Sequence, residues 1–224
     1  MTASVFFEIR SLADLDGVTA SVGPVGPRTG PGKRTKQQTE WWVLSRFLEK
    51  AIPADIFRLP VEGRRGHPKD EPDFVLMRPG TTDVIALIEI TVATDETDQR
   101  EMTAFERSPA KMALVGHSGG RFPRGLARPE LAWASDIVAA IKRKKPKVIF
   151  KHSPTARHLI IYPSSNATIL LSDEREQEAI DCLREAIDSA RKNLAKVTNG
   201  CLVHVLGTRH ICLDVVGDMR VLHR

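Results

Sequence analysis

The chain has 224 residues, 42% of them hydrophobic and 27% charged, which is ordinary for a soluble globular protein. Its longest apolar run, residues 84–92, contains Glu89 and is far shorter than the roughly 20 residues of a membrane helix. The N-terminus lacks the pattern of a signal peptide, and the net charge of +5 permits an anionic partner without requiring one.

The N-terminal part of the chain predicts a short segment, a linker and a helix. A segment at residues 4–10 precedes a Gly/Pro-rich stretch, residues 17–32, whose composition is typical of a flexible arm. Thr35 and Gln38 have the spacing of a capping box, in which each side chain binds an N–H group at the helix start. We therefore expect a helix over residues 35–51.

The rest of the chain alternates between strand and helix patterns. The expected elements are strand 55–60, basic turn 62–72, strand 73–77, strand 84–94, helix 94–107, basic loop 116–130, helix 131–145, strand 158–163, helix 172–197 and strands 202–206 and 211–216. The short turn RPGTTD joins two of the strands into a hairpin. This order predicts an α/β fold with a mixed central β-sheet flanked by helices. Residues 1–34 are expected to form the segment and arm, and residues 35–224 a single domain.

Two carboxylates interrupt the predicted hairpin. Side chains alternate along a strand, so Glu89 shares one face with Leu87 and Thr91. A lone ionised Glu is costly to bury unless a cation, a hydrogen-bonding partner or water satisfies it. Asp73 opens the neighbouring strand, and hard cations such as Mg²⁺ are held by one or two carboxylates. We therefore predict that Asp73 and Glu89 converge on one divalent cation, with Glu40 approaching from the helix packed on the sheet.

Simpler roles exist for these acids. Glu89 could be a structural acid paired with an arginine such as Arg58. Glu40 could lie at the edge of its helix in contact with water. Both alternatives stay open at the level of the sequence.

Three elements carry these acids in the order of a known motif: Glu40 on a helix, Pro72-Asp73 on a strand, and Glu89-Ile90-Thr91 on the next strand. This arrangement resembles the PD-(D/E)XK nuclease superfamily, whose pattern is Pro-Asp, a variable spacer, then an acid, any residue and Lys. The helix after the hairpin and the strand LIIY at residues 159–162 are also similar to that family's core. The resemblance covers residues 35–200 and implies a restriction endonuclease-like core.

The resemblance also implies an activity, which is metal-dependent hydrolysis of the phosphodiester bonds of nucleic acid. Asp73, Glu89 and the backbone carbonyl of Ile90 would bind Mg²⁺ or Mn²⁺, and Glu40 would orient a water or extend the metal shell. The ion would polarise the phosphate and lower the pKa of a bound water. The implied catalytic residues are Glu40, Asp73, Glu89 and Thr91.

Thr91 departs from the pattern, because the family has a lysine at this position. A hydroxyl can hydrogen-bond a water but cannot supply the positive charge of an ammonium. A lysine from elsewhere could replace it, with Lys111 and Lys142 as candidates. Alternatively, Thr91 could suffice with two metals, or the chain could be a catalytically degenerate protein that only binds nucleic acid or another protein.

Basic residues gather in loops and near the end of one predicted helix. The predicted nucleic-acid contacts, with DNA preferred over RNA, are Arg121, Arg124, Lys142, Lys144 and Lys145. For the lysines among residues 142–147, a favourable position at a helix C-terminus is an alternative role. No membrane partner is expected, and a homodimer is allowed.

The chain has three cysteines, Cys182, Cys201 and Cys212. Their odd number, wide spacing and lack of a C-x-x-C pair argue against a disulfide framework or a thiolate zinc site. This cysteine usage predicts a reducing, cytoplasmic location.

Overall fold

The fold is seen in a computed structural model, which describes residues 6–22, 35–66, 71–93, 128–144, 155–163, 173–198, 200–206, 210–214 and 219–222. Within these residues, the strands form one eight-stranded sheet in which each strand lies beside its neighbours in the chain. The strands are β1 (Phe6–Ile9), β2 (Val61–Arg65), β3 (Phe74–Met77), β4 (Val84–Ala93), β5 (Ala156–Pro163), β6 (Leu202–Leu206), β7 (His210–Asp214) and β8 (Met219–Leu222).

The sheet is mixed. Strands β1 to β4 pair antiparallel, β4, β5 and β6 run parallel, and β6 to β8 pair antiparallel again. Parallel neighbours need a crossover connection, and a helix lies in each of the two crossovers here. The predicted α/β class with a mixed central sheet is therefore confirmed, and so is the hairpin of β3 and β4.

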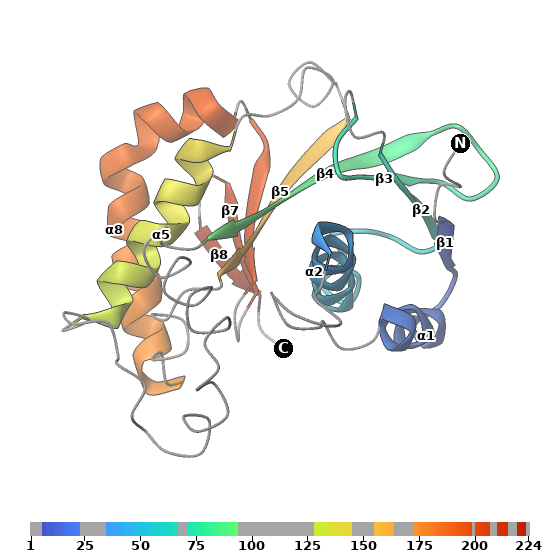
Figure 1. Ribbon diagram of the computed structural model, residues 1–224, viewed down its shortest axis with the longest axis horizontal. Helices are drawn as coiled ribbons and strands as arrows, with labels where there is room; N and C mark the ends of the chain where they lie inside the picture. Colours follow the sequence, from blue (N-terminus) through green and yellow to red (C-terminus); the bar gives the residue numbers. More distant parts are fainter. Residues whose placement is uncertain are drawn as a thin grey trace, which may run out of the picture.

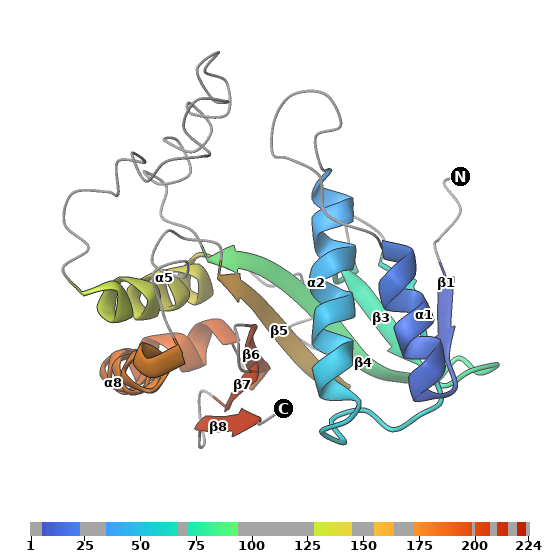
Figure 2. The same ribbon diagram turned by 90° about the horizontal axis from the view of Figure 1, so that it is seen from below.

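Helices cover both faces of the sheet (Figures 1 and 2). On one face lie α1 (Leu12–Val22) and α2 (Lys36–Ala51), and on the other lie α5 (Pro129–Arg143) and α8 (Asp173–Thr198). Each pair of helices encloses its own hydrophobic core against the sheet. The sheet is thus the middle of three layers.

Strands β3 and β4 contribute to both cores. Val75 and Leu87 face α5 and α8, whereas Phe74 and Ile88 face α2. This alternation follows from the period of two along a strand. Because both faces are covered, β4 is apolar at nearly every position, and Glu89 is the exception that needs a local explanation.

The start of α2 has the predicted capping box. The Gln38 N–H donates to the Thr35 hydroxyl oxygen at 3.1 Å, and the Thr35 N–H donates to the Gln38 side-chain oxygen at 2.7 Å. The buried stripe of the helix includes Leu44, Phe47 and Leu48 at helical spacing. The predicted helix over residues 35–51 is confirmed.

The predicted strand at 55–60 is wrong, because the strand lies at β2, most of which falls in the stretch predicted as a basic turn. Asp55 has a positive φ of 56°, which is incompatible with a strand. Within β2, Gly63 lies beneath the Phe7 ring, whose nearest carbon would be 2.1 Å from a Cβ at that position. Pairing with β1 and β3 therefore determines the strand, and a larger residue at position 63 would require the Phe7 ring to move.

The N-terminal residues join the same sheet. Helix α1 includes residues 17–22, so the first part of the predicted flexible arm is helical, and residues 23–34 lie outside the described residues. Ile9 and Leu15 are buried in the α2 core, at 0% and 3% exposure. The composition predicted a linker because the stretch is rich in Gly and Pro. The apolar residues Ile9 and Leu15, which precede it, nevertheless pack into the core.

The C-terminal half follows the predicted order. Helices α5 and α8 and strands β5, β6 and β7 occur within a few residues of the expected positions, and β8 is an additional strand that was not predicted. The predicted helix at 94–107 and nearly all of the predicted loop at 116–130 lie outside the described residues.

Candidate functional site

Asp73 and Glu89 lie side by side at the face of the sheet covered by α5. Phe74 of β3 is paired with Ile88 of β4, which places the preceding Asp73 next to Glu89 in this antiparallel pair. The Asp73 Oδ2 atom accepts a hydrogen bond of 2.8 Å from the Ile90 N–H, which holds the carboxylate against β4. The structure thus brings together the two acids that the hairpin predicted to be neighbours.

One ammonium group lies between the two carboxylates. Lys144 Nζ is 2.6 Å from Glu89 Oε2 and 3.7 Å from Asp73 Oδ2, and it donates a hydrogen bond of 2.9 Å to the Ile90 carbonyl. The side chain of Glu89 is 1% exposed and that of Asp73 is 10% exposed. Such buried carboxylates require a compensating charge, and Lys144 provides it.

Lys144 reaches this position from the C-terminal end of α5. The side of α5 that packs on the sheet includes Trp133, Ile137 and Ile141, which recur at intervals of four residues. Lys144 follows three residues after Ile141, a spacing that also stays on this side of a helix, and its backbone N–H still bonds to the carbonyls of Ala140 and Ile141 where the helix ends. The side chain of Lys144 therefore points toward the sheet at the end of the apolar stripe of α5.

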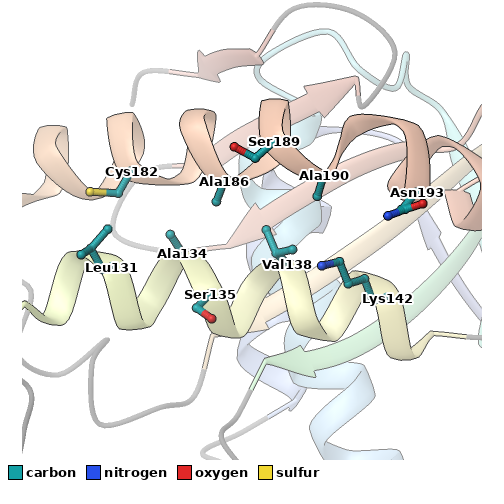
Figure 3. A pocket seen from close by; sticks show the side chains of 10 residues that line it. All are labelled: Leu131, Ala134, Ser135, Val138, Lys142, Cys182, Ala186, Ser189, Ala190 and Asn193. Carbon is teal, nitrogen blue, oxygen red and sulfur yellow. The ribbon is translucent and has the colours of Figure 1, made fainter.

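Lys144 was not predicted to belong to the acidic site; it was predicted as a nucleic-acid contact, with a favourable position at a helix C-terminus as the alternative. Of the two lysines considered for that site, Lys111 lies outside the described residues. Lys142 is exposed and lines a groove of about 430 Å³ between α5 and α8 (Figure 3). The period of the α5 stripe is the signal that distinguishes Lys144 from Lys142.

Glu40 lies on α2, the helix that covers the opposite face of the sheet, and its side chain is buried. Its carboxylate forms ion pairs with Arg65 of β2 and with Lys36, whose Nζ lies 3.2 Å from Glu40 Oε1. The alternative in which Glu40 is a solvated acid is therefore wrong. Among the described residues, no three His, Cys, Asp or Glu side chains form one metal-binding group, so Glu40 is not grouped with Asp73 and Glu89.

The two acidic positions are nevertheless electrostatically linked. The Glu40 carboxylate raises the pKa of Lys36, and the charge of Asp73 adds to this rise to a smaller extent. Lys36 therefore lies within the field of both acids. Its side chain is largely exposed, so this cation is available at the surface beside the site.

The other predicted site residues are placed as follows. Thr91 is half-buried and lies two residues beyond Glu89, on the same face of β4. Arg121, Arg124 and Lys145 lie outside the described residues. The pairing of Glu89 with Arg58 is wrong, because Glu89 pairs with Lys144 and Arg58 lies 3.4 Å from Asp55.

The oxygens around Lys144 are of the kind that binds a hard divalent cation. Carboxylates and a backbone carbonyl are the usual protein ligands of Mg²⁺, and here they already hold a positive charge. The set of Asp73, Glu89 and the Ile90 carbonyl therefore fits the ion that the sequence predicts. Glu40 would require a change in its two ion pairs to join that set.

A buried histidine pair, which was not predicted from the sequence, is formed by one residue of β5 and one of β6. His158 Nδ1 is 2.8 Å from His204 Nε2, and the two rings are stacked next to Phe47. Burial lowers the pKa of His158 to about 4, so the ring is neutral near pH 7. One ring must then donate and the other accept, which makes this pair a polar contact within the α2 side of the core.

The described cysteines are buried free thiols. Cys182 and Cys201 form no disulfide, and burial raises the pKa of Cys201 to about 12. Cys201 is therefore a poor nucleophile. The side chain of Cys212 lies outside the described residues.

Comparison with known proteins identifies no relative: no protein-family model, no curated protein and no solved structure matches this chain. None of the helices that the structure describes is long and apolar enough to cross a membrane. The class of the protein is thus defined by its fold, an α/β layer with a mixed sheet that carries a buried acidic site holding a cationic group.

Proposed function

We propose that this chain is a metal-dependent nuclease that hydrolyses phosphodiester bonds of nucleic acid, with DNA as the first substrate to test. The observation that carries the proposal is the convergence of the Asp73 and Glu89 carboxylates and the Ile90 carbonyl on one positive charge. The order of a helix with Glu40, a strand after Pro72-Asp73 and a strand with Glu89 also supports a PD-(D/E)XK-like core.

In this proposal, Asp73, Glu89 and the Ile90 carbonyl hold Mg²⁺ or Mn²⁺. When bound, the ion polarises the phosphate and makes a coordinated water more acidic. Glu40 pairs with Lys36 and Arg65, and Lys36, which also lies in the field of Asp73, is an exposed cation that favours the phosphates of the substrate backbone. In this proposal, Glu40 is a positioning residue, and the motif predicts that it also orients the water.

Lys144 replaces the lysine that the motif has at Thr91. Its ammonium contacts both carboxylates here, and after the cation displaces it, the flexible side chain can still reach a phosphate bound at that cation. An ammonium there donates hydrogen bonds and offsets negative charge that develops on the phosphate oxygens. The Thr91 hydroxyl, on the same face, can hydrogen-bond the attacking water.

A cleavage assay tests this proposal. The chain is incubated with linear DNA, circular DNA and RNA in Mg²⁺, in Mn²⁺ or in EDTA. We expect cleavage that requires a divalent cation and that falls to background in Asp73→Asn and in Glu89→Gln. Glu185→Gln is the matched control, because it removes an exposed carboxylate on α8 by the same acid-to-amide change. Circular dichroism establishes that each variant is folded. Cleavage that persists in EDTA or in both site variants contradicts the proposal.

The second candidate is a catalytically degenerate protein that binds nucleic acid or another protein. The observation that favours it is the uncharged Thr91 at the lysine position of the motif. This candidate predicts nucleic-acid binding that weakens steeply with salt, without cleavage in Mg²⁺ or Mn²⁺. A lack of affinity even at low salt favours a protein partner. A homodimer and a cytoplasmic location stay predictions.

A further inference from the structure

We infer that Lys144 and a divalent cation are alternative occupants of one site, so that the chain carries its own competitor for the metal. The inference rests on the proposed function, in which Asp73 and Glu89 bind the ion. It adds that the ion enters only when the Lys144 ammonium leaves.

The geometry requires this exclusion. Lys144 Nζ lies 2.6 Å from Glu89 Oε2, 2.9 Å from the Ile90 carbonyl oxygen and 3.7 Å from Asp73 Oδ2. An Mg²⁺ ion lies about 2.1 Å from each oxygen that it binds, so an ion held by these three oxygens lies in the space between them that the ammonium now fills. Two cations cannot share that position.

The charges lead to the same conclusion. In the described ion pairs, Lys144 faces Asp73 and Glu89. A divalent ion added beside Glu89, whose side chain is 1% exposed, meets the Lys144 ammonium in a poorly solvated site, where repulsion between like charges is strong. Release of Lys144 removes the repulsion at the closest distance.

Lys144 is well placed to leave. Its side chain is 20% exposed, and the residue follows the last turn of α5. The departing ammonium therefore moves toward solvent without crossing the core. There it adds to the positive surface beside the site, which favours a polyanion such as a nucleic-acid backbone.

Calorimetric titration with Mn²⁺ and with Mg²⁺ tests the competition without an activity assay. The proteins are the wild type, Lys144→Met and the control Lys142→Met, which removes a charge from the same helix at an exposed position. If the ammonium fills the site for at least about nine-tenths of the time, its removal tightens the apparent Kd at least about tenfold. Lys142→Met should bind the ions as the wild type does.

Thermal unfolding provides a second readout. In EDTA, Lys144→Met leaves two buried carboxylates without their cation, so its Tm should fall by about 6 °C or more. Mn²⁺ or Mg²⁺ should restore most of that loss, whereas the wild type should respond much less. The double variant Lys144→Met with Glu89→Gln should be more stable in EDTA than Lys144→Met and should lose the response to the ions.

Chemical labelling tests the wild type directly, even if Lys144→Met does not fold. Lysines are acetylated with an activated ester in EDTA or at saturating Mn²⁺, and the sites are quantified by mass spectrometry. Labelling of Lys144 should rise when Mn²⁺ is present, whereas labelling of Lys142 should stay constant.

The outcomes separate the two proposals. If the wild type binds the ions, Lys144→Met binds them no more tightly and Lys144 labelling does not change, the competition is overturned and the proposed metal site stands. If neither protein binds Mn²⁺ or Mg²⁺, the metal site and the competition are both overturned.

Discussion

The burial of Glu89 alone indicates that a charged site is present on β4. Its side chain is almost completely buried in a strand that is apolar on both faces, a position that an ionised carboxylate occupies only with a compensating partner. The partner is the Lys144 ammonium, which lies 2.6 Å from Glu89 Oε2 and also faces Asp73. The Glu40 carboxylate meets the same requirement with Lys36 and Arg65.

The buried His158–His204 pair predicts a pH dependence of stability. The pKa of His158 is about 4 in the folded chain and about 6.5 in the unfolded chain, so the unfolded chain binds more protons between these values. Stability is therefore lost as the pH falls below about 6.5. We expect this residue to contribute a loss of about 2 kcal/mol between pH 7 and pH 5.

Urea unfolding of the wild type and His158→Gln at pH 7 and pH 5 measures this effect. Glutamine keeps hydrogen-bonding capacity and removes the titration, so the variant should lose less stability over this pH range than the wild type. Equal losses in the two proteins would contradict the assignment. The quantity compared is the change in the free energy of unfolding between pH 7 and pH 5, measured in the same way for the wild type and for His158→Gln.

At the scale of elements, the phase of a helix decides which side chains reach the sheet. Helix α5 presents Ile137, Ile141 and then Lys144 on one stripe, whereas Lys142 points to the groove beside α8. Two lysines that are nearly adjacent in the sequence therefore have different surroundings. Helix α2 likewise places Glu40 on the side of its buried stripe.

The capping box of α2 predicts a specific loss of stability. Thr35→Ala removes the oxygen that accepts the Gln38 N–H, and we expect the free energy of unfolding to fall by about 1 kcal/mol. The matched control is Thr39→Ala, whose hydroxyl donates only to the Thr35 carbonyl within the first turn and should change stability by less than about 0.5 kcal/mol. Urea unfolding measures both. Equal effects would indicate that the cap is not formed in solution.

At the scale of the molecule, the sheet separates two cores and joins the N-terminal segment to the rest. Strand β1 pairs with β2, and Ile9 and Leu15 are buried against α2. On the α2 side, Trp41 lies between the rings of Phe7 and Phe74, with ring centroids 5.3 and 4.9 Å away. The residues before the predicted domain boundary therefore complete this core.

Deletion of residues 1–22 tests this arrangement. The deletion removes the buried side chains of Ile9 and Leu15 and exposes the apolar surface that they cover. We therefore expect the free energy of unfolding to fall by about 3 kcal/mol or more. Deletion of residues 1–5 alone, which precede β1, is the control and should have a much smaller effect. Urea unfolding followed by tryptophan fluorescence measures both. Unchanged stability of the shorter chain would support a separate N-terminal segment.

The sequence predicted most of the elements but not all of their positions. Helix α2 was predictable because its capping residues and apolar stripe are local signals, and β3 and β4 because a short turn joins apolar runs. Strand β2 was not predictable, because Gly63 and the arginines favour a turn by composition. Its pairing with β1 depends on residues more than fifty positions away in the chain.

The sequence by itself determined that Asp73 and Glu89 would be neighbours, since a hairpin and the alternation of side chains require it. The α/β class also followed from the order of local patterns. Only the tertiary structure decided which cation faces these acids and that Glu40 is held by Arg65 and Lys36. The physical reason is that ion pairs between distant elements depend on how α5 and α2 pack on the sheet, which short-range patterns do not encode.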